Sequence, residues 1–229
     1  MSTVDHRRTA STAAAATGAQ AAQRATRSLL TCAVVATPLW AVVALTQAAA
    51  RDGFDITRHP LSALSNGDLG WLQITNFLIV GTLLTLGATG LHRALHGTPG
   101  GAWAPRLVRV AGIGMIAAGV FVMDPADGFP VGTPYGMPAE LTWHSYAHFA
   151  AGSITFLSMI AACYVLARHF NRAGNRGYTL LARIGGTALL LGNGWSMTGG
   201  KAGTLTLAVG VMTAMLAISL IANRYRSSH

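Results

Sequence analysis

The sequence predicts an all-α integral membrane protein, a bundle of six transmembrane helices with both termini in the cytoplasm. Three observations lead to this fold class. Hydrophobic residues make up 52% of the 229 residues, and charged residues only 10%, far below the roughly 25% of a soluble domain. The apolar residues are gathered into six long runs. The basic residues alternate between the connections that separate those runs. We therefore expect the chain to lie in a lipid bilayer.

Each apolar run is close to the roughly 20 residues that a helix needs to cross about 30 Å of hydrocarbon. None has an acidic residue near its centre, where a charge costs roughly 3 kcal/mol. The third run is the shortest, and the fifth contains Asn193 and several glycines. We predict that all six are spans of one transmembrane domain, residues 29–222. The runs are Leu29 to Ala49, Trp71 to Leu91, Leu107 to Met123, Trp143 to Ala167, Thr179 to Met197 and Ala202 to Ala222.

The segments on either side of this domain are polar or basic. Residues 1–28 are rich in Ala, Ser, Thr and Gln with scattered Arg, a composition that predicts a disordered cytoplasmic tail. Residues 223–229 form a short basic cytoplasmic tail. The first run, preceded by Arg24 and Arg27 and followed by small residues, also resembles a secretory signal. Its apolar stretch is longer than a usual signal core, which favours a retained span.

The distribution of charge predicts the orientation. Of the 16 Lys and Arg, 13 lie before the first run, around the second and fourth connections, or after the last run, and only Arg51, Arg58 and Lys201 lie in the other connections. By the positive-inside rule the basic side is cytoplasmic. Six of the seven acidic residues fall on the opposite side. Topology in a cell membrane thus explains the net charge of +9, and nucleic-acid binding is not expected.

The two long connections, Ala50 to Gly70 and Asp124 to Thr142, both fall on the outer face. Long connections of this kind are often functional. Pro60 is well placed to open a short helix in the first. The second contains too many prolines for a helix, and we expect it to form an extended cover over the outer end of the bundle.

Candidate catalytic and metal-binding residues lie at the outer entry to the fourth run. His144 and His148 are four residues apart, so they share a helix face, and Asp124 could supply a carboxylate. This set could hold a divalent metal such as zinc and activate water for hydrolysis, with Ser62 as a further catalytic candidate. The other outer-face candidates are Arg58, His59, Asp127 and Glu140. On the same helix face follows a small and polar stripe suited to the bundle interior, which consists of Ala151, Thr155, Ser158 and Ala162.

A structural interpretation stands beside the metal hypothesis. Trp143 and Tyr146 flank the two histidines, which could simply belong to an interfacial aromatic belt. His92 and His96 have the same spacing with no acid nearby, so the spacing alone is a weak signal.

Other polar and small residues lie inside the predicted spans. For Asn76 and Asn193 we expect interhelical hydrogen bonds rather than ligand contacts. We also expect glycines to form close-packing surfaces between helices, namely Gly112, Gly114, Gly119, Gly185 and Gly186.

Four short motifs carry a resemblance to a known family. They are Arg58 to Leu64, Gly67 to Trp71, Asp124-Pro125 with Gly128 to Pro130, and His144 to His148. In this order they resemble the domain-of-unknown-function 998 family of multi-spanning membrane proteins. The resemblance implies a multi-spanning fold, but because the family has no established activity it implies no catalytic residue. The His, Asp and Ser set is also similar to that of ceramidase-like hydrolases, which differ in having seven spans and three ligand histidines.

Three functional hypotheses follow from the sequence, which leaves open whether the protein is an enzyme. The first is a non-enzymatic membrane protein whose outer face binds a partner, a lipid or a small amphipathic ligand. The second is a metal-assisted hydrolase at the outer boundary. The third is a small transporter, acting as a homo-oligomer. No Walker loop or dinucleotide-binding fingerprint is present in the sequence.

Overall fold

The computed structural model describes the backbone of residues 3–228 and the side chains of residues 18–228. Within these residues the chain forms a bundle of six α-helices without a β-strand, and a single short 3-10 helix, η1, lies in the connection between the first two helices. The elements are α1 (Thr3–Ala50), η1 (Leu61–Ser65), α2 (Gly70–Ala94), α3 (Trp103–Val120), α4 (Trp143–Arg172), α5 (Arg176–Met197) and α6 (Gly203–Ser228).

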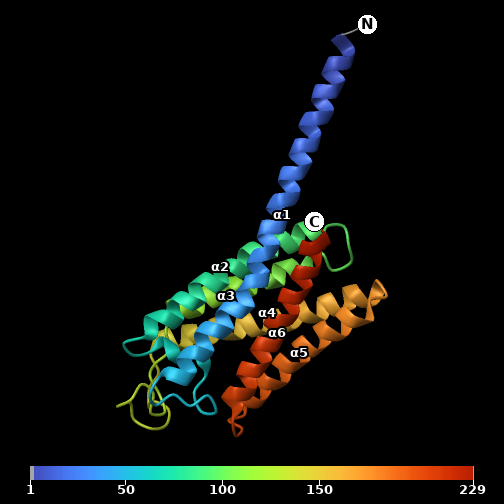
Figure 1. Cartoon of the computed structure of the whole chain (residues 1–229). Coiled ribbons are helices and arrows are strands. Elements are labelled where there is room, and N and C mark those ends of the chain that lie inside the picture. Colours follow the sequence, from blue (N-terminus) through green and yellow to red (C-terminus); the bar gives the residue numbers. More distant parts are fainter. Residues whose placement is uncertain (1–2, 229) are drawn as a thin grey trace.

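The six helices form a closed ring. Each helix packs against its neighbours in sequence, and α1 packs against α6. The last contact includes a buried hydrogen bond of 2.7 Å from Ser219 Oγ to the Ala33 carbonyl. Figure 1 shows the start of α1 and the end of α6 at one end of the bundle and the two long connections at the other. The candidate site residues of the outer connections are thereby gathered at one end of the ring.

In the part of the chain that the structure describes, five helices are long and apolar enough to cross a membrane, namely α2, α3, α4, α6 and the Gly18–Ala50 part of α1. This confirms the prediction of an all-helical protein with several membrane spans. The helix that is not among the five is α5, which contains Arg183 and Asn193 and packs between α4 and α6. These polar side chains lower the mean hydropathy of a helix that is otherwise of sufficient length.

The first helix begins earlier than its apolar run. Composition predicts disorder over residues 1–28, whereas α1 is already helical from Thr3, and Figure 1 shows its first half projecting beyond the bundle. The segment is rich in alanine, the residue with the highest helix propensity, so an α-helix is its favoured local conformation even without tertiary contacts. At the other end, residues 223–228 of the predicted basic tail are the last turns of α6.

Glycines allow the helices to approach closely. A Cβ atom on Gly112 of α3 would lie 2.7 Å from the Gly81 carbonyl oxygen of α2, and a Cβ on Gly185 of α5 would lie 2.8 Å from the Ala217 Cβ of α6. Only glycine fits such backbone approaches. The prediction that these glycines form close-packing surfaces is confirmed.

The two long connections have the local structures that their prolines predict. Pro60 directly precedes η1, as predicted, because its fixed φ suits the start of a helical turn. The connection between α3 and α4 contains no helix in the structure described, also as predicted. Phe129 from this connection is 1% exposed, so the connection is anchored in the protein core.

Candidate functional site

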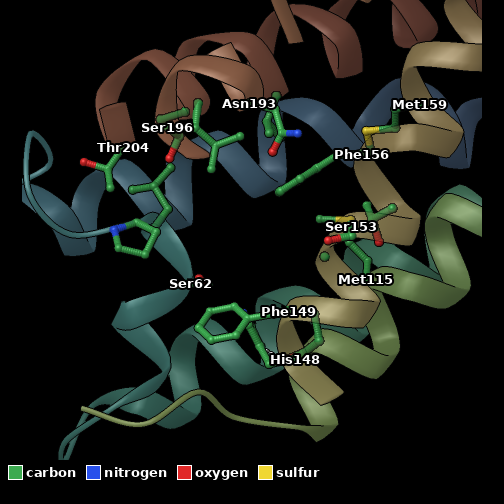
Figure 2. A pocket seen from close by; sticks show the side chains of 18 of the residues that line it. Ser62, Met115, His148, Phe149, Ser153, Phe156, Met159, Asn193, Ser196 and Thr204 are labelled. Atoms are coloured by element: carbon green, nitrogen blue, oxygen red, sulfur yellow. Dashed lines mark hydrogen bonds between the residues drawn. The ribbon is translucent and has the colours of Figure 1, made fainter. Parts of the chain in front are cut away.

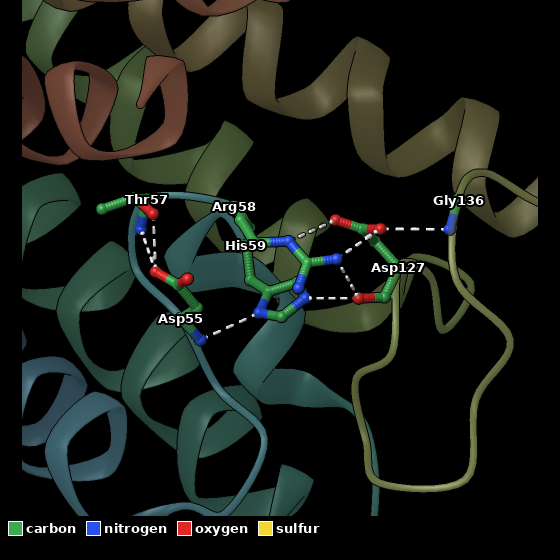
Figure 3. A network of polar contacts seen from close by, with 6 residues as sticks. All are labelled: Asp55, Thr57, Arg58, His59, Asp127 and Gly136. Carbon is green, nitrogen blue, oxygen red and sulfur yellow. Dashed lines mark hydrogen bonds and ion pairs between the residues drawn. The ribbon is translucent and has the colours of Figure 1, made fainter. Parts of the chain in front are cut away.

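An ion pair and several hydrogen bonds hold together the two long connections, which join α1 to α2 and α3 to α4 (Figure 3). Arg58 Nη2 lies 2.7 Å from Asp127 Oδ1, and the Gly136 N–H donates to the same carboxyl oxygen at 3.0 Å. The hydrogen bond from Gly136 and the charge of Arg58 lower the pKa of Asp127 below its ordinary value. The carboxylate of Asp127 therefore ties its own connection to Arg58 of the first connection, and also to Gly136 further along the second.

His59 is bonded through both of its ring nitrogens. The Asp55 N–H donates to His59 Nδ1 at 2.9 Å, so Nδ1 is an acceptor and the ring proton is on Nε2. His59 Nε2 lies 2.9 Å from the Asp127 carbonyl oxygen, to which it donates. The ring is 3% exposed and lies against Phe54 and Phe129. In this arrangement neither nitrogen has a lone pair free for a metal.

Arg51 completes this arrangement from the end of α1. Its guanidinium donates to the Leu64 and Asn66 carbonyls at 2.6 and 2.5 Å and lies 4.7 Å from the centre of the Phe129 ring. Burial lowers the pKa of Arg51 from its ordinary value. We call the set Arg51, Arg58, His59, Asp127 and Phe129 the outer-loop network. Its contacts join the two connections to η1 at the end of the bundle that lies opposite the start of α1.

Asp124 forms hydrogen bonds that join both ends of the connection between α3 and α4. Its carboxylate accepts from the Thr142 N–H at 2.7 Å and from the Thr142 hydroxyl at 2.8 Å, while its own N–H donates to Ser145 Oγ at 2.7 Å. The Thr142 N–H is the main cause of a lowered pKa of Asp124. Thr142 is also the N-cap of α4, so Asp124 fixes the start of that helix.

His144 and His148 lie in different surroundings despite their spacing. His144 is exposed, and its ring centre lies 3.8 Å from that of Trp143. His148 is 5% exposed. No group of three or more His, Cys, Asp or Glu side chains among the described residues is arranged to hold a metal. Metal binding by Asp124, His144 and His148 stays a prediction.

The bonds of His148 determine which nitrogen carries its proton. Nδ1 lies 2.9 Å from the Ala118 carbonyl oxygen and 2.8 Å from that of Phe121. Both partners are acceptors, so Nδ1 must carry the hydrogen. In the neutral ring Nε2 then has a free lone pair, and within the part of the chain that the structure describes it makes no hydrogen bond.

His148 lines a cavity of ≈ 290 Å³ inside the helix ring. Every helix and η1 contribute to its wall, and Figure 2 shows His148 and Phe149 on the opposite side from Asn193 and Ser196. Most of the wall is apolar; its larger side chains are Trp40, Leu61, Phe77, Met115, Phe149, Phe156, Met159, Met197, Leu207 and Val211. Its polar side chains are Ser62, His148, Ser153, Thr155, Asn193, Ser196 and Thr204.

The structure brings some sequence candidates to this cavity and not others. Ser62, His148 and Asn193 line it, whereas Asp124 does not. Asn76 donates to the Trp40 carbonyl of α1 at 3.3 Å, which confirms its predicted interhelical role. Asn193 instead makes only a long contact of 3.8 Å with Met197 Sδ in its own helix. Glu140 is exposed.

Sequence reasoning missed most of the cavity wall. The stripe Ala151, Thr155, Ser158 and Ala162 is buried, as predicted, but the adjacent face of α4 with Ser153 and Phe156 also lines the cavity. Ser196 and Thr204, near the ends of α5 and α6, complete it from the other side. These residues show no periodic or motif signal, because only the crossing of α4 with α5 and α6 brings them together.

Comparison with known proteins identifies the family. The family described as "Protein of unknown function (DUF998)" matches residues 34–224, which include all six helices in whole or in part. The chain therefore belongs to this family. No curated protein and no solved structure is significantly similar to it.

Proposed function

We propose that this DUF998 protein binds a small, largely apolar molecule in the cavity at the outer end of its helix ring. The main support for this proposal is the cavity itself, which has a volume of ≈ 290 Å³ and a wall that is mostly apolar with a few polar groups. Ligand pockets have this composition, and their volumes begin near 300 Å³. At roughly 30 Å³ for each non-hydrogen atom, the cavity accommodates about ten such atoms.

The proposal places this cavity in the outer half of a membrane bundle with six spans. Pro60, Leu61 and Ser62 of its wall belong to the first outer connection, and the outer-loop network lies over the same end. In this topology α5 spans with the other five helices, both termini are cytoplasmic and the protein resides in the cell membrane. The excess of basic residues on the opposite side supports this orientation.

Photolabelling tests the binding proposal. The protein in lipid nanodiscs is irradiated with an alkyl diazirine of about ten carbons, and the labelled peptides are mapped. We expect labelling of Phe149 to Phe156 and of Asn193 to Met197, with competition by excess unlabelled alkane. Labelling confined to lipid-facing residues such as Leu157 and Leu191, without saturation, would contradict the proposal.

Cysteine accessibility tests the topology. Single cysteines at Asp68 and Val131 should react with an impermeant maleimide from outside intact cells, and those at Thr98 and Ala173 only after permeabilisation. The background variant replaces Cys32 and Cys163. The reverse pattern would place the cavity at the cytoplasmic end.

A metal-assisted hydrolase is the second candidate, and one observation favours it. The lone pair of His148 Nε2 is free, and Ser62 lines the same cavity. In this proposal His148, His144 and Asp124 bind a divalent metal such as zinc, which activates water. Metal content of the purified protein, measured before and after both histidines are changed to Ala, tests it. Equal amounts of metal in the two samples would exclude these ligands.

A further inference from the structure

Several polar groups of the cavity wall present hydrogen-bond acceptors to its interior. Three hydroxyl groups of its wall donate their protons to the protein itself. Ser62 Oγ donates to Met123 Sδ at 3.3 Å, Thr155 Oγ1 to the Ala151 carbonyl at 2.8 Å, and Thr204 Oγ1 to the Ile56 carbonyl at 2.8 Å. The lone pairs of these hydroxyl oxygens remain available to accept a hydrogen bond from a ligand.

His148 adds the strongest acceptor. Its Nδ1–H donates to two carbonyls that end α3, which leaves Nε2 as a lone pair on a ring that lines the cavity. A lone pair of this kind inside an apolar wall is stabilised when a donor reaches it. The tautomer is set by backbone carbonyls of the protein itself, so the acceptor is present before any ligand arrives.

The cavity wall has no fixed charge. Among the described residues that line it there is no Asp, Glu, Lys or Arg. A cationic or anionic group would therefore enter without a counter-ion, at a cost of several kcal/mol. A neutral donor, such as a hydroxyl or an amide N–H, has no such penalty.

We propose that the cavity selects neutral amphiphiles that carry a hydrogen-bond donor at one end, and that His148 Nε2 accepts that hydrogen bond. This inference rests on the proposed function, because it names the chemical class of the ligand. The apolar part of the molecule lies against Trp40, Phe77 and Phe156. Alcohols with a chain of about ten carbons are of this class.

Decanol and decyl methyl ether provide a matched pair of ligands, because both have a ten-carbon chain of about the length the cavity accommodates and only the alcohol has a donor. Each competes with the alkyl diazirine for photolabelling in nanodiscs, with concentrations expressed per lipid. We expect the alcohol to compete about tenfold better than the ether, which is the effect of one hydrogen bond in an apolar site.

Two variants assign this preference to one nitrogen. In His148→Asn the side-chain amide can still donate to the Ala118 and Phe121 carbonyls, but no atom takes the place of Nε2. In His148→Gln the amide reaches the position of Nε2 and restores an acceptor. We expect the preference for the alcohol to disappear in the first and to persist in the second. A purely structural role for His148 would lower competition by both ligands equally and leave their ratio unchanged.

The outcomes separate the two proposals. If neither compound competes in the wild-type protein, binding in the cavity is wrong and the selectivity falls with it. If both compete equally well in the wild-type protein, binding stands and the selectivity for donors is overturned. If the alcohol is preferred and His148→Asn retains the full preference, the acceptor is not His148. The wild-type comparison stays informative even if a variant does not fold.

Discussion

Filling the cavity at Gly152 should weaken ligand binding about a hundredfold without harming the fold. A Cβ atom on this α4 residue would meet only the Phe156 ring, at 4.0 Å, and Gly152 lines the cavity. The four side-chain carbons of Gly152→Leu occupy about 120 Å³ at roughly 30 Å³ each. That is a large share of the ≈ 290 Å³ available. A ligand thereby loses the burial of about four methylene groups, or about 3 kcal/mol, which corresponds to a hundredfold weaker affinity.

The assay is saturable photolabelling by the alkyl diazirine, with thermal unfolding as a check of the fold. Replacing a helical glycine with leucine favours the helix by up to about 1 kcal/mol, so the variant should be at least as stable as the wild type. Gly194→Leu is the matched control, because a Cβ on Gly194 of α5 has no atom within 4 Å and this residue does not line the cavity. Unchanged affinity in a folded Gly152→Leu protein would refute the reasoning.

The remaining predictions concern the scaffold of the site. His59→Phe keeps the ring packing but leaves the Asp55 N–H without a partner and removes one of the two hydrogen bonds to the Asp127 carbonyl, so it should lower the free energy of unfolding by about 2 kcal/mol. His144→Phe, at an exposed ring, should change it by less than about 0.5 kcal/mol, and thermal unfolding compares the two. In Gly112→Val the new Cβ would lie 2.7 Å from a carbonyl oxygen of α2; we expect loss of the folded protein in size-exclusion chromatography, whereas Gly194→Val should behave as wild type. The folded pKa of Asp127 is lowered, so its contribution is present above the unfolded pKa of about 3.9 and is lost as pH falls through the folded pKa. Proteolysis of the outer connections should accelerate at that acidic pH in the wild type, but should be fast and independent of pH across this range in Asp127→Asn.

The sequence predicted the parts of the candidate site that depend on one helix. Residues 151, 155, 158 and 162 were placed in the interior by the 3.6-residue period alone, and all four are buried. The sequence also indicated that Asp124 and His148 lie near each other, at the junction of α3 and α4. It could not show that Asp124 bonds to Thr142 or that the proton of His148 is on Nδ1. Those hydrogen bonds involve backbone groups, which are the same in every residue, so the sequence contains no pattern that predicts them.

The structure also separated residues of similar chemistry. His59, His144 and His148 are all outer-face histidines in the sequence. The first has both nitrogens bonded to backbone groups, the second lies on Trp143, and only the third lines the cavity. Asn76 and Asn193 divide in the same way, one bonded to α1 and the other lining the cavity wall. Burial and partners, rather than residue type, make the difference.

By itself the sequence determined that this is a helical membrane protein of a recognisable family, because hydrophobic run length and glycine placement are local properties of the chain. The distribution of charge also predicts which end faces outward. Only the tertiary structure decided that the helices close into a ring with a cavity between them and that the ring of His148 lines this cavity with its proton on Nδ1. A cavity exists where side chains from distant segments fail to fill space, so the sequence of any single segment cannot predict it.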